Sequence, residues 1–288
     1  MVSQQPQSRA AGRSTARGGV KSCMRALQVI EFFTRTARPA RTVEISQSLS
    51  IPNSSADEIL RTLAAEGYIS YDTTTKLYAP SYKLVASSRT IEQNFFGGNC
   101  IDALMDDMRS ELGATVYLTQ QNDCWVQPVA EVRGDWVEKG SAPHYPDEMV
   151  CYAGDCWQPG TNFAAAMLTR YSNVELVDLT VRTQRMGIGP KGPSMVKRLV
   201  ELVGRARARG YALCRRGSAV QVDSIAMPLP LSQAMTPYAV GIVGAHLFNS
   251  RADEKTMVGA MHAVLNRHRD GLSSVRGHAC APLARNSA

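Results

Sequence analysis

The side chains best suited to contact a nucleic acid lie between Arg41 and Lys76. If residues 54–66 form a helix, its outward positions carry small, hydrogen-bonding or charged groups, which are the types that read base edges in a major groove. Arg41 and Lys76 flank this helix and could contact phosphates, although solvated surface charge is the plainer alternative. The predicted DNA-contacting residues are Arg41, Ser54, Ser55, Asp57, Arg61, Thr62 and Lys76.

Two carboxylates on the same predicted helix need a separate explanation, because Asp57 and Glu58 would repel phosphate. They could cap the helix start in the patterns Ser54-x-x-Asp57 or Ser55-x-x-Glu58, where they would also complement the helix dipole. They could instead accept a hydrogen bond from cytosine N4, or simply weaken DNA binding. Of these alternatives, we expect capping.

Other chemically capable residues give weaker signals. Arg215 and Arg216 could hold a carboxylate ligand, but a surface pair at a strand end is the plainer interpretation. Cys151 and Cys156, with His144 nearby, lack the spacing of a zinc pair, so thiol or metal sensing is a minor alternative. The sequence contains no Gly-x-Ser-x-Gly, HExxH or GxxxxGK[ST] motif. We therefore expect no catalytic residue, no cofactor, no metal and no enzyme activity.

The excess positive charge lies almost entirely in the first third of the chain. Residues 1–90 hold 12 Lys and Arg against 6 Asp and Glu, a net charge of +6, whereas residues 91–288 hold 20 against 19. This asymmetry indicates that one segment meets a polyanion. No apolar run approaches 18 residues, so no membrane helix is expected. Seven scattered cysteines favour a reducing compartment, hence the cytoplasm.

Hydrophobic periodicity predicts a winged helix-turn-helix in this basic third. Ser22 is expected to cap the first helix and Thr42 the second. Residues 1–20, which contain arginines but no acid, are expected to form a disordered arm. The buried face of the first helix is predicted to comprise Met24, Leu27, Ile30 and Phe33. The predicted elements are helices over 23–35, 42–49 and 54–66, and a hairpin of strands 68–71 and 76–78.

The remainder is predicted to be a linker helix followed by an α+β domain with five or six mostly antiparallel strands. Residues 134–148 and 180–193 are rich in Gly and Pro and predict loops, and the polar tail 270–288 predicts disorder. The predicted helices cover 81–95, 99–112, 161–170, 194–209 and 251–268, and the predicted strands cover 115–121, 124–133, 149–153, 211–215, 222–229 and 238–247.

Several segments of this chain resemble the IclR family of bacterial transcription regulators. The resemblance covers residues 22–268 and is specific in the first domain and diffuse in the second. The segments that carry it are Met24–Glu31, Val43–Leu49, Ile51–Ser55, Leu60–Leu63, Glu66–Ile69, Leu77–Tyr78, Arg207–Ala212 and Ser224–Pro228.

The resemblance implies an effector-responsive regulator that binds double-stranded operator DNA as a homodimer or homotetramer, away from membranes. Its second domain would be GAF-like and would bind a small organic effector, with an aromatic or small carboxylic acid catabolite as the expected class. The implied domains are an arm at 1–20, a winged helix-turn-helix at 21–80, a linker helix at 81–97, an effector-binding domain at 98–269 and a tail at 270–288.

The resemblance also implies an effector site, with core packing as the alternative for each member. The implied residues are Tyr117, Tyr152, Trp157, Thr161, Cys214, Arg215, Ser224, Ile242 and Gly244. Two departures leave the effector open: Ala164-Ala165-Ala166 replaces the family's Gly-Lys-Ala, and Arg215-Arg216 replaces an acidic run before Ser224. A different class of protein also remains open: a ligand-binding protein or an enzyme in which the winged helix makes contacts with other proteins.

Overall fold

The computed structural model describes residues 20–98, 100–134, 149–150, 160–185, 194–215, 222–231, 236–244 and 247–275. The chain divides into two compact units, Met1–Thr90 and Ile91–Ala288, which we call the N-terminal and C-terminal units. Because the boundary falls inside one helix, the predicted linker belongs partly to each unit.

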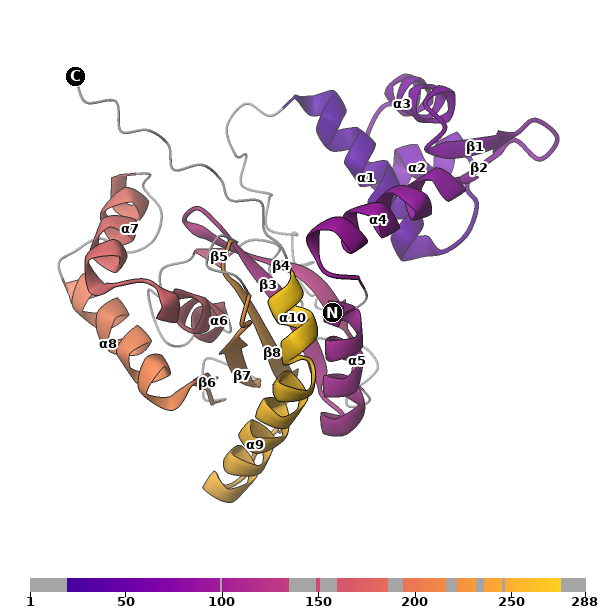
Figure 1. The fold of residues 1–288 in the computed structure, drawn as a ribbon. Helices are drawn as coiled ribbons and strands as arrows, with labels where there is room; N and C mark the ends of the chain where they lie inside the picture. Colours follow the sequence, from indigo (N-terminus) through magenta and orange to yellow (C-terminus); the bar gives the residue numbers. More distant parts are fainter. Residues whose placement is uncertain are drawn as a thin grey trace, which may run out of the picture. The chain divides into compact units, whose positions relative to one another are not determined.

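The N-terminal unit has the predicted winged helix-turn-helix fold (Figure 1). Three helices precede an antiparallel hairpin in which Ile69 pairs with Pro80 and Asp72 pairs with Leu77. Its elements are α1 (Lys21–Thr36), α2 (Thr42–Leu49), α3 (Asn53–Ala65), β1 (Ile69–Asp72), β2 (Leu77–Pro80) and α4 (Tyr82–Phe95), the last of which crosses into the C-terminal unit.

The buried face of α1 differs from the prediction. Phe33 is buried as predicted, but Met24 and Leu27 are 50% and 58% exposed, and the helix buries Val29 and Phe32 in addition. These three residues pack in one cluster with residues of α2, α3 and the hairpin, including Ile45, Leu60, Ile69 and Tyr78. The sequence of α1 has apolar residues on more than one side, so spacing alone could not identify the side that its neighbours would cover.

The helix starts also differ from the predicted caps. Val20 is the N-cap of α1 and makes no side-chain capping bond, so Ser22 lies inside the helix. Arg41 is the N-cap of α2, and its backbone N–H donates to Oε2 of Glu44 at 3.2 Å, so Thr42 is the first helical residue. The second helix is therefore capped by a carboxylate reaching back from its first turn rather than by a hydroxyl.

The C-terminal unit is built on a six-stranded sheet in the order β5-β4-β3-β8-β7-β6, in which every neighbouring pair is antiparallel. This confirms the predicted α+β class. The strands are β3 (Thr115–Asn122), β4 (Trp125–Val132), β5 (Met149–Val150), β6 (Ala212–Cys214), β7 (Asp223–Pro228) and β8 (Tyr238–Gly244).

Helices cover both faces of this sheet, so that two apolar layers form (Figure 1). One face packs against α6 (Gly160–Met167), the short 3-10 helix η1 (Leu168–Arg170), α7 (Asn173–Arg185) and α8 (Ser194–Arg209). The other packs against α5 (Cys100–Leu112), α9 (Arg251–Arg267) and α10 (Arg269–Ser274). None of the described helices combines the length and apolar character needed to span a bilayer.

Two predicted irregular segments are wrong where the structure describes them. Residues 180–185, predicted as loop, form the end of α7, whose Leu176 and Leu179 are buried. The predicted disordered tail begins with α10, and Leu272 and Val275 are buried in the core. Residues 1–19, 135–148, 151–159, 186–193 and 276–288 lie outside the described residues, so the arm, the first loop and the rest of the second loop and tail stay predictions.

A close approach between β8 and α6 generates a stability prediction. A Cβ on Gly241 would lie 2.6 Å from two ring carbons of Phe163 and 2.5 Å from the carbonyl oxygen of Ile225. Because this interior cannot accommodate a methyl group, we expect Gly241→Ala to lower the free energy of unfolding by about 1–3 kcal/mol. Guanidinium unfolding followed by circular dichroism would measure the difference.

The control is Gly259→Ala in α9, where nothing lies within 4 Å of the added Cβ. Alanine favours a helix interior over glycine by roughly 0.5–1 kcal/mol, so this variant should be as stable as the parent or more so. A Gly241→Ala protein as stable as the parent would contradict the described contact.

Candidate nucleic-acid interface and ligand-binding face

The outer face of α3 is available for contact, as the sequence predicts. Ala56 and Leu60 point into the core of the N-terminal unit, whereas Ser54, Arg61 and Thr62 are exposed on the helix. Their neighbours Ser55 and Asp57 are partly exposed. The second helix of a helix-turn-helix pair enters a major groove in this way, with its core-facing side held by the other helices.

The predicted capping role of Asp57 and Glu58 is wrong. The N-cap of α3 is Pro52, which makes no side-chain capping bond, so Ser54 and Ser55 already lie inside the helix. Asp57 instead forms an ion pair with Arg61 one turn later, with 2.8 Å between Oδ2 and Nη2. Such an exposed pair contributes little to stability, but it restricts where the guanidinium can point.

The turn of the hairpin is held in shape by one carboxylate. Asp72 accepts hydrogen bonds from the backbone N–H of Thr74 at 2.8 Å and from the hydroxyl of Thr75 at 2.7 Å. The Thr75 hydroxyl, and then the Thr74 N–H, lower the pKa of Asp72 below its usual value. The last turn residue, Lys76, is exposed and has a positive φ of 59°, so this turn presents a cation at a defined position.

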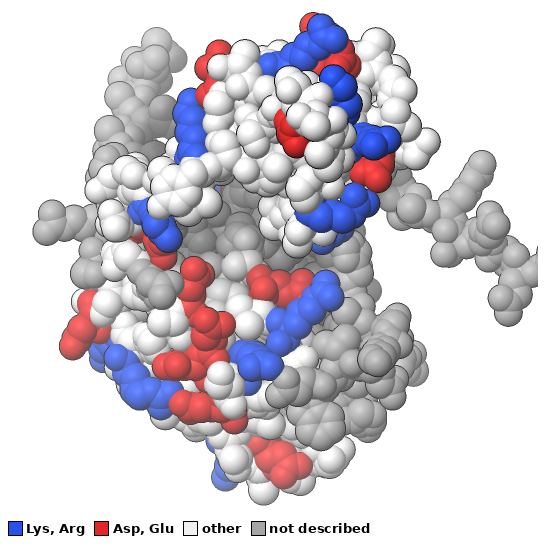
Figure 2. All heavy atoms as spheres, turned by 90° about the vertical axis from the view of Figure 1, so that its right-hand side faces the viewer, with Lys and Arg blue, Asp and Glu red and all other residues white. Residues whose placement is uncertain are grey.

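The charges around this candidate interface are mixed rather than uniformly basic. Arg41 is exposed at the start of α2, and Arg38 pairs with Glu44 at 3.2 Å. Figure 2 shows basic and acidic side chains interspersed on the visible surface of the N-terminal unit. On this face, therefore, the cations do not form one continuous patch.

The second candidate site lies on the face of the sheet that α6 covers. Tyr117 and Cys214 belong to the buried cluster on this face, and Ser224 pairs with Cys214 in register across β6 and β7. Burial, and then Glu131, raise the pKa of Tyr117 to about 12. The structure thus brings three of the predicted effector residues to one face.

Three other predicted effector residues lie elsewhere. Ile242 belongs to the cluster on the α5 and α9 face, because neighbouring residues of a strand point to opposite sides. Gly244 shares that orientation, and a Cβ there would lie 2.8 Å from Leu247. Arg215 pairs with Glu254 of α9 at 2.5 Å and lies over the ring of Phe248, so its guanidinium is already engaged.

The remaining sequence-predicted residues cannot be placed by their side chains. Thr161 is the second residue of α6, and Tyr152 and Trp157 lie outside the described residues. His144, Cys151 and Cys156 lie outside them as well. Within the part of the chain that the structure describes, no group of three or more His, Cys, Asp or Glu side chains is placed to hold a metal ion.

The sequence reasoning missed Asn162, which is 2% exposed on α6. Within the described part of the chain, neither its Oδ1 nor its Nδ2 atom has a hydrogen-bond partner, and the hydroxyl of Ser224 also lacks one. Buried polar groups are normally paired, so these three atoms are exceptions that call for an explanation. The only sequence signal was a single amide side chain ahead of an otherwise apolar run.

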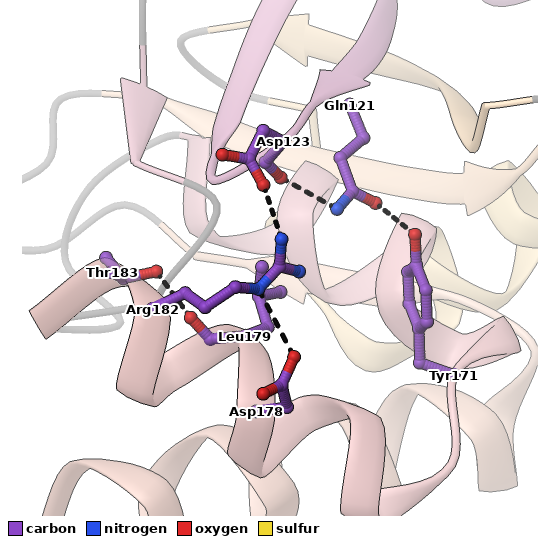
Figure 3. Close-up of polar contacts among 7 residues, drawn as sticks. All are labelled: Gln121, Asp123, Tyr171, Asp178, Leu179, Arg182 and Thr183. Carbon is purple, nitrogen blue, oxygen red and sulfur yellow. Dashed lines mark hydrogen bonds and ion pairs between the residues drawn. The ribbon is translucent and has the colours of Figure 1, made fainter. Parts of the chain in front are cut away.

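A polar network ties the β3–β4 turn to the helices on the same face (Figure 3). Tyr171 donates to Oε1 of Gln121 at 3.0 Å, and Gln121 donates to the carbonyl oxygen of Asp123 at 2.9 Å. Arg182 of α7 pairs with Asp123 at 2.8 Å and with Asp178 at 3.2 Å. These contacts connect the β3–β4 turn to Tyr171 and to α7.

The ion pair that holds Arg215 generates a pH prediction. Burial opposes ionisation of Glu254, but hydrogen bonds from Tyr211 and Arg215 outweigh it and lower the pKa of this carboxyl. Glu254→Gln should therefore lower the free energy of unfolding at pH 7 by about 1–2 kcal/mol, since Arg215 is half exposed. Denaturant unfolding from pH 7 to pH 3 would measure this.

The direction of this pH dependence follows from the lowered pKa of Glu254 in the native state. The stabilisation is fully present above the unfolded pKa of about 4.3 and is lost as pH falls through the native value, so parent and variant should converge in acid. Glu201→Gln is the control, because its pair with Lys197 is exposed and 4.0 Å long. A difference that stays constant down to pH 3 would contradict the assigned ion pair.

Comparison with known proteins agrees with this architecture. The sequence model of the IclR helix-turn-helix domain matches residues 22–73, although no curated protein matches the chain. An IclR transcriptional regulator from Alicyclobacillus acidocaldarius is 18% identical, with a TM-score of 0.58 over 89% of this chain and 100% of that one. The IclR of Thermotoga maritima is 16% identical, with a TM-score of 0.59 over 87% of this chain and 98% of that one.

A third structure contains a bound small molecule. It is an IclR homolog from Microbacterium hydrocarbonoxydans complexed with 4-hydroxybenzoate, 12% identical, with a TM-score of 0.54 over 87% of this chain and 100% of that one. At such identities, likeness to these structures establishes the fold. Residues 22–73 therefore match the helix-turn-helix domain of the IclR family and, over nearly nine tenths of its length, the chain has the fold of IclR transcriptional regulators.

Proposed function

We propose that this protein regulates transcription by binding operator DNA through α3 and the β1–β2 hairpin. The observation that carries the proposal is the exposed face of α3 inside a matched IclR helix-turn-helix domain. The net charge of +6 over residues 1–90 supports it, because phosphate neutralisation supplies most of non-specific DNA affinity. Ser54, Ser55 and Thr62 would face base edges, and Arg41 and Lys76 would face phosphates.

Arg61 is the residue best suited to a base contact. A guanidinium has five N–H donors, and the pair with Asp57 engages Nη2, which leaves other donors for the two acceptors of guanine. The carboxylate that repels phosphate would thus also hold the reading side chain in place. The repulsion between the Asp57 carboxylate and nearby phosphates would be offset because the same carboxylate positions the Arg61 guanidinium.

We also propose that the C-terminal unit binds a small organic effector that changes DNA binding. The 4-hydroxybenzoate complex of the Microbacterium hydrocarbonoxydans homolog and the unpaired polar atoms on the α6 face support this proposal. An aromatic or small carboxylic acid catabolite is the class suggested by the family resemblance. Such an effector must bind two arrangements of the protein with different affinity, or it changes nothing.

Substitution of Arg61 tests the DNA contact. Fluorescence anisotropy of the full-length protein on a duplex from its own upstream region should show that Arg61→Ala weakens binding, by about 1–3 kcal/mol if it reads a guanine. Binding by the parent should also fall steeply with salt.

Arg182→Ala is the matched control, because it removes one partly exposed, ion-paired arginine from α7 in the C-terminal unit. Affinity of this control should equal that of the parent. Equal affinity for all three proteins, or no dependence on salt, would remove the proposed interface.

We propose that the protein acts as a homodimer or homotetramer. Met24 and Leu27 of α1 and its N-cap residue Val20 are apolar and 50–65% exposed, and Val85 of α4 is also exposed. Large apolar side chains clustered on a surface mark association sites, and a second copy would bury them. A dimer would place two α3 helices about 34–36 Å apart on DNA.

Leu27→Glu tests the association. Sedimentation velocity should show a dimer or tetramer for the parent and a shift toward monomer for the variant, because the substitution would bury a charge in the interface. Val177→Glu on α7, which is 40% exposed, is the control and should not change the parent's state. A monomeric parent would contradict the proposal.

A further inference from the structure

The unpaired polar atoms on the α6 face specify what kind of ligand could bind there. Asn162 contributes one donor group and one acceptor, both buried and both without a partner among the residues that the structure describes. Ser224 is fully buried, and its hydroxyl, which can donate and accept, is also unpaired. A buried polar group that makes no hydrogen bond destabilises the protein, so a ligand that supplied the missing partner would recover that cost.

The packing of α6 brings these two residues to the same end of the sheet. The helix lies across β6, β7 and β8. Phe163 contacts Gly241, while Met167 lies near Thr119, which pairs with Ala239, so α6 runs antiparallel to β8. The start of the helix therefore lies toward Val243, and Val243 pairs directly with Ser224.

The elements that carry Asn162 and Ser224, together with β6 and β8, offer an anion no cationic side chain. The sequences of α6, β6, β7 and β8 contain no Lys, Arg or His. Their one charged residue is Asp223, whose carboxylate accepts from the backbone N–H of Leu247. Arg215, at the end of β6, is paired with Glu254. An anion bound at this place would lose its hydration without gaining a cation from these elements.

Oδ1 of Asn162, which is a hydrogen-bond acceptor, decides which chemical group of a ligand fits this site. The start of α6 favours any acceptor oxygen, since the first N–H groups of a helix lack internal partners. A carboxylate can only accept, and it would leave Oδ1 of Asn162 unpaired. A carboxamide or lactam edge donates one N–H to Oδ1 and accepts from Nδ2, so it pairs both ends of the side chain.

We infer that the α6 face binds an uncharged ligand through an amide-type edge, with Asn162 and Ser224 as its specificity-determining residues. This inference rests on the proposed effector-binding function and deepens it by naming the recognised group. It also departs from the carboxylic acid class, because a carboxylate has no N–H to donate to Oδ1 of Asn162.

Matched amide and acid probes test the inference on the full-length protein. Thermal unfolding would be followed with benzamide and benzoate, and with 4-hydroxybenzamide and 4-hydroxybenzoate, at equal millimolar concentrations. The amides should raise the Tm of the parent more than the acids do. Titration calorimetry should give at least a tenfold weaker affinity for the amide in Ser224→Ala and in Asn162→Asp.

Ser224→Ala is the deciding variant, because a carboxylate at position 162 could itself unfold the unit. Removing an unpaired hydroxyl should raise the Tm of the ligand-free protein while the amide response is reduced. Thr180→Val is the control: this buried hydroxyl donates to the carbonyl oxygen of Leu176 at 2.8 Å. Its loss should not raise the Tm and should leave the amide response unchanged.

Several outcomes would overturn the inference. They are an acid response equal to or above the amide response in the parent, an unchanged amide response in Ser224→Ala, or no response to either amide. Operator binding measured on the same preparations separates this result from the proposed function. Lost DNA binding with an intact amide response removes the regulator proposal alone, and intact DNA binding without an amide response removes the ligand inference alone.

Discussion

The alternation of side chains across the antiparallel sheet is the constraint on which the candidate sites of the C-terminal unit depend. In β3, β7 and β8, each residue is committed to one of two apolar layers by its position in the pairing register. Tyr117 and Ser224 therefore belong to the α6 layer, and Ile242 belongs to the α5 and α9 layer. Consecutive residues of one strand therefore lie in different apolar layers, on opposite faces of the sheet.

Close packing of α6 against one face of the sheet creates a buried polar site on that face. The absence of a side chain at Gly241 lets the ring of Phe163 rest on β8, so the helix axis lies near the strands. The same approach buries Asn162, whose amide finds no protein partner. Evolution tolerates such a cost mainly where the group serves a function, because an apolar residue of similar size would be more stable.

In the N-terminal unit, α3 is likewise divided into residues that pack in the core and residues that lie on the surface. Ala56 and Leu60 hold α3 in the core, while Asp57 and Arg61 pair on the opposite side. The pair explains how an acidic residue can occupy a helix that is suited to approach a polyanion. Its carboxylate restrains a guanidinium instead of facing the phosphates alone.

The sequence by itself determined the fold class, the winged helix-turn-helix and the residues exposed on α3, because these follow from local periodicity, turn residues and charge. It could not determine which side of α1 is buried, that Asp57 pairs with Arg61 rather than capping α3, or that Arg215 pairs with Glu254. It also gave no warning that Asn162 is buried without a partner. The buried side of α1, the Arg215–Glu254 pair and the burial of Asn162 depend on contacts between residues far apart in the chain, so only the tertiary packing decides them. The Asp57–Arg61 pair is local: its i,i+4 spacing is present in the sequence, where capping was the competing interpretation.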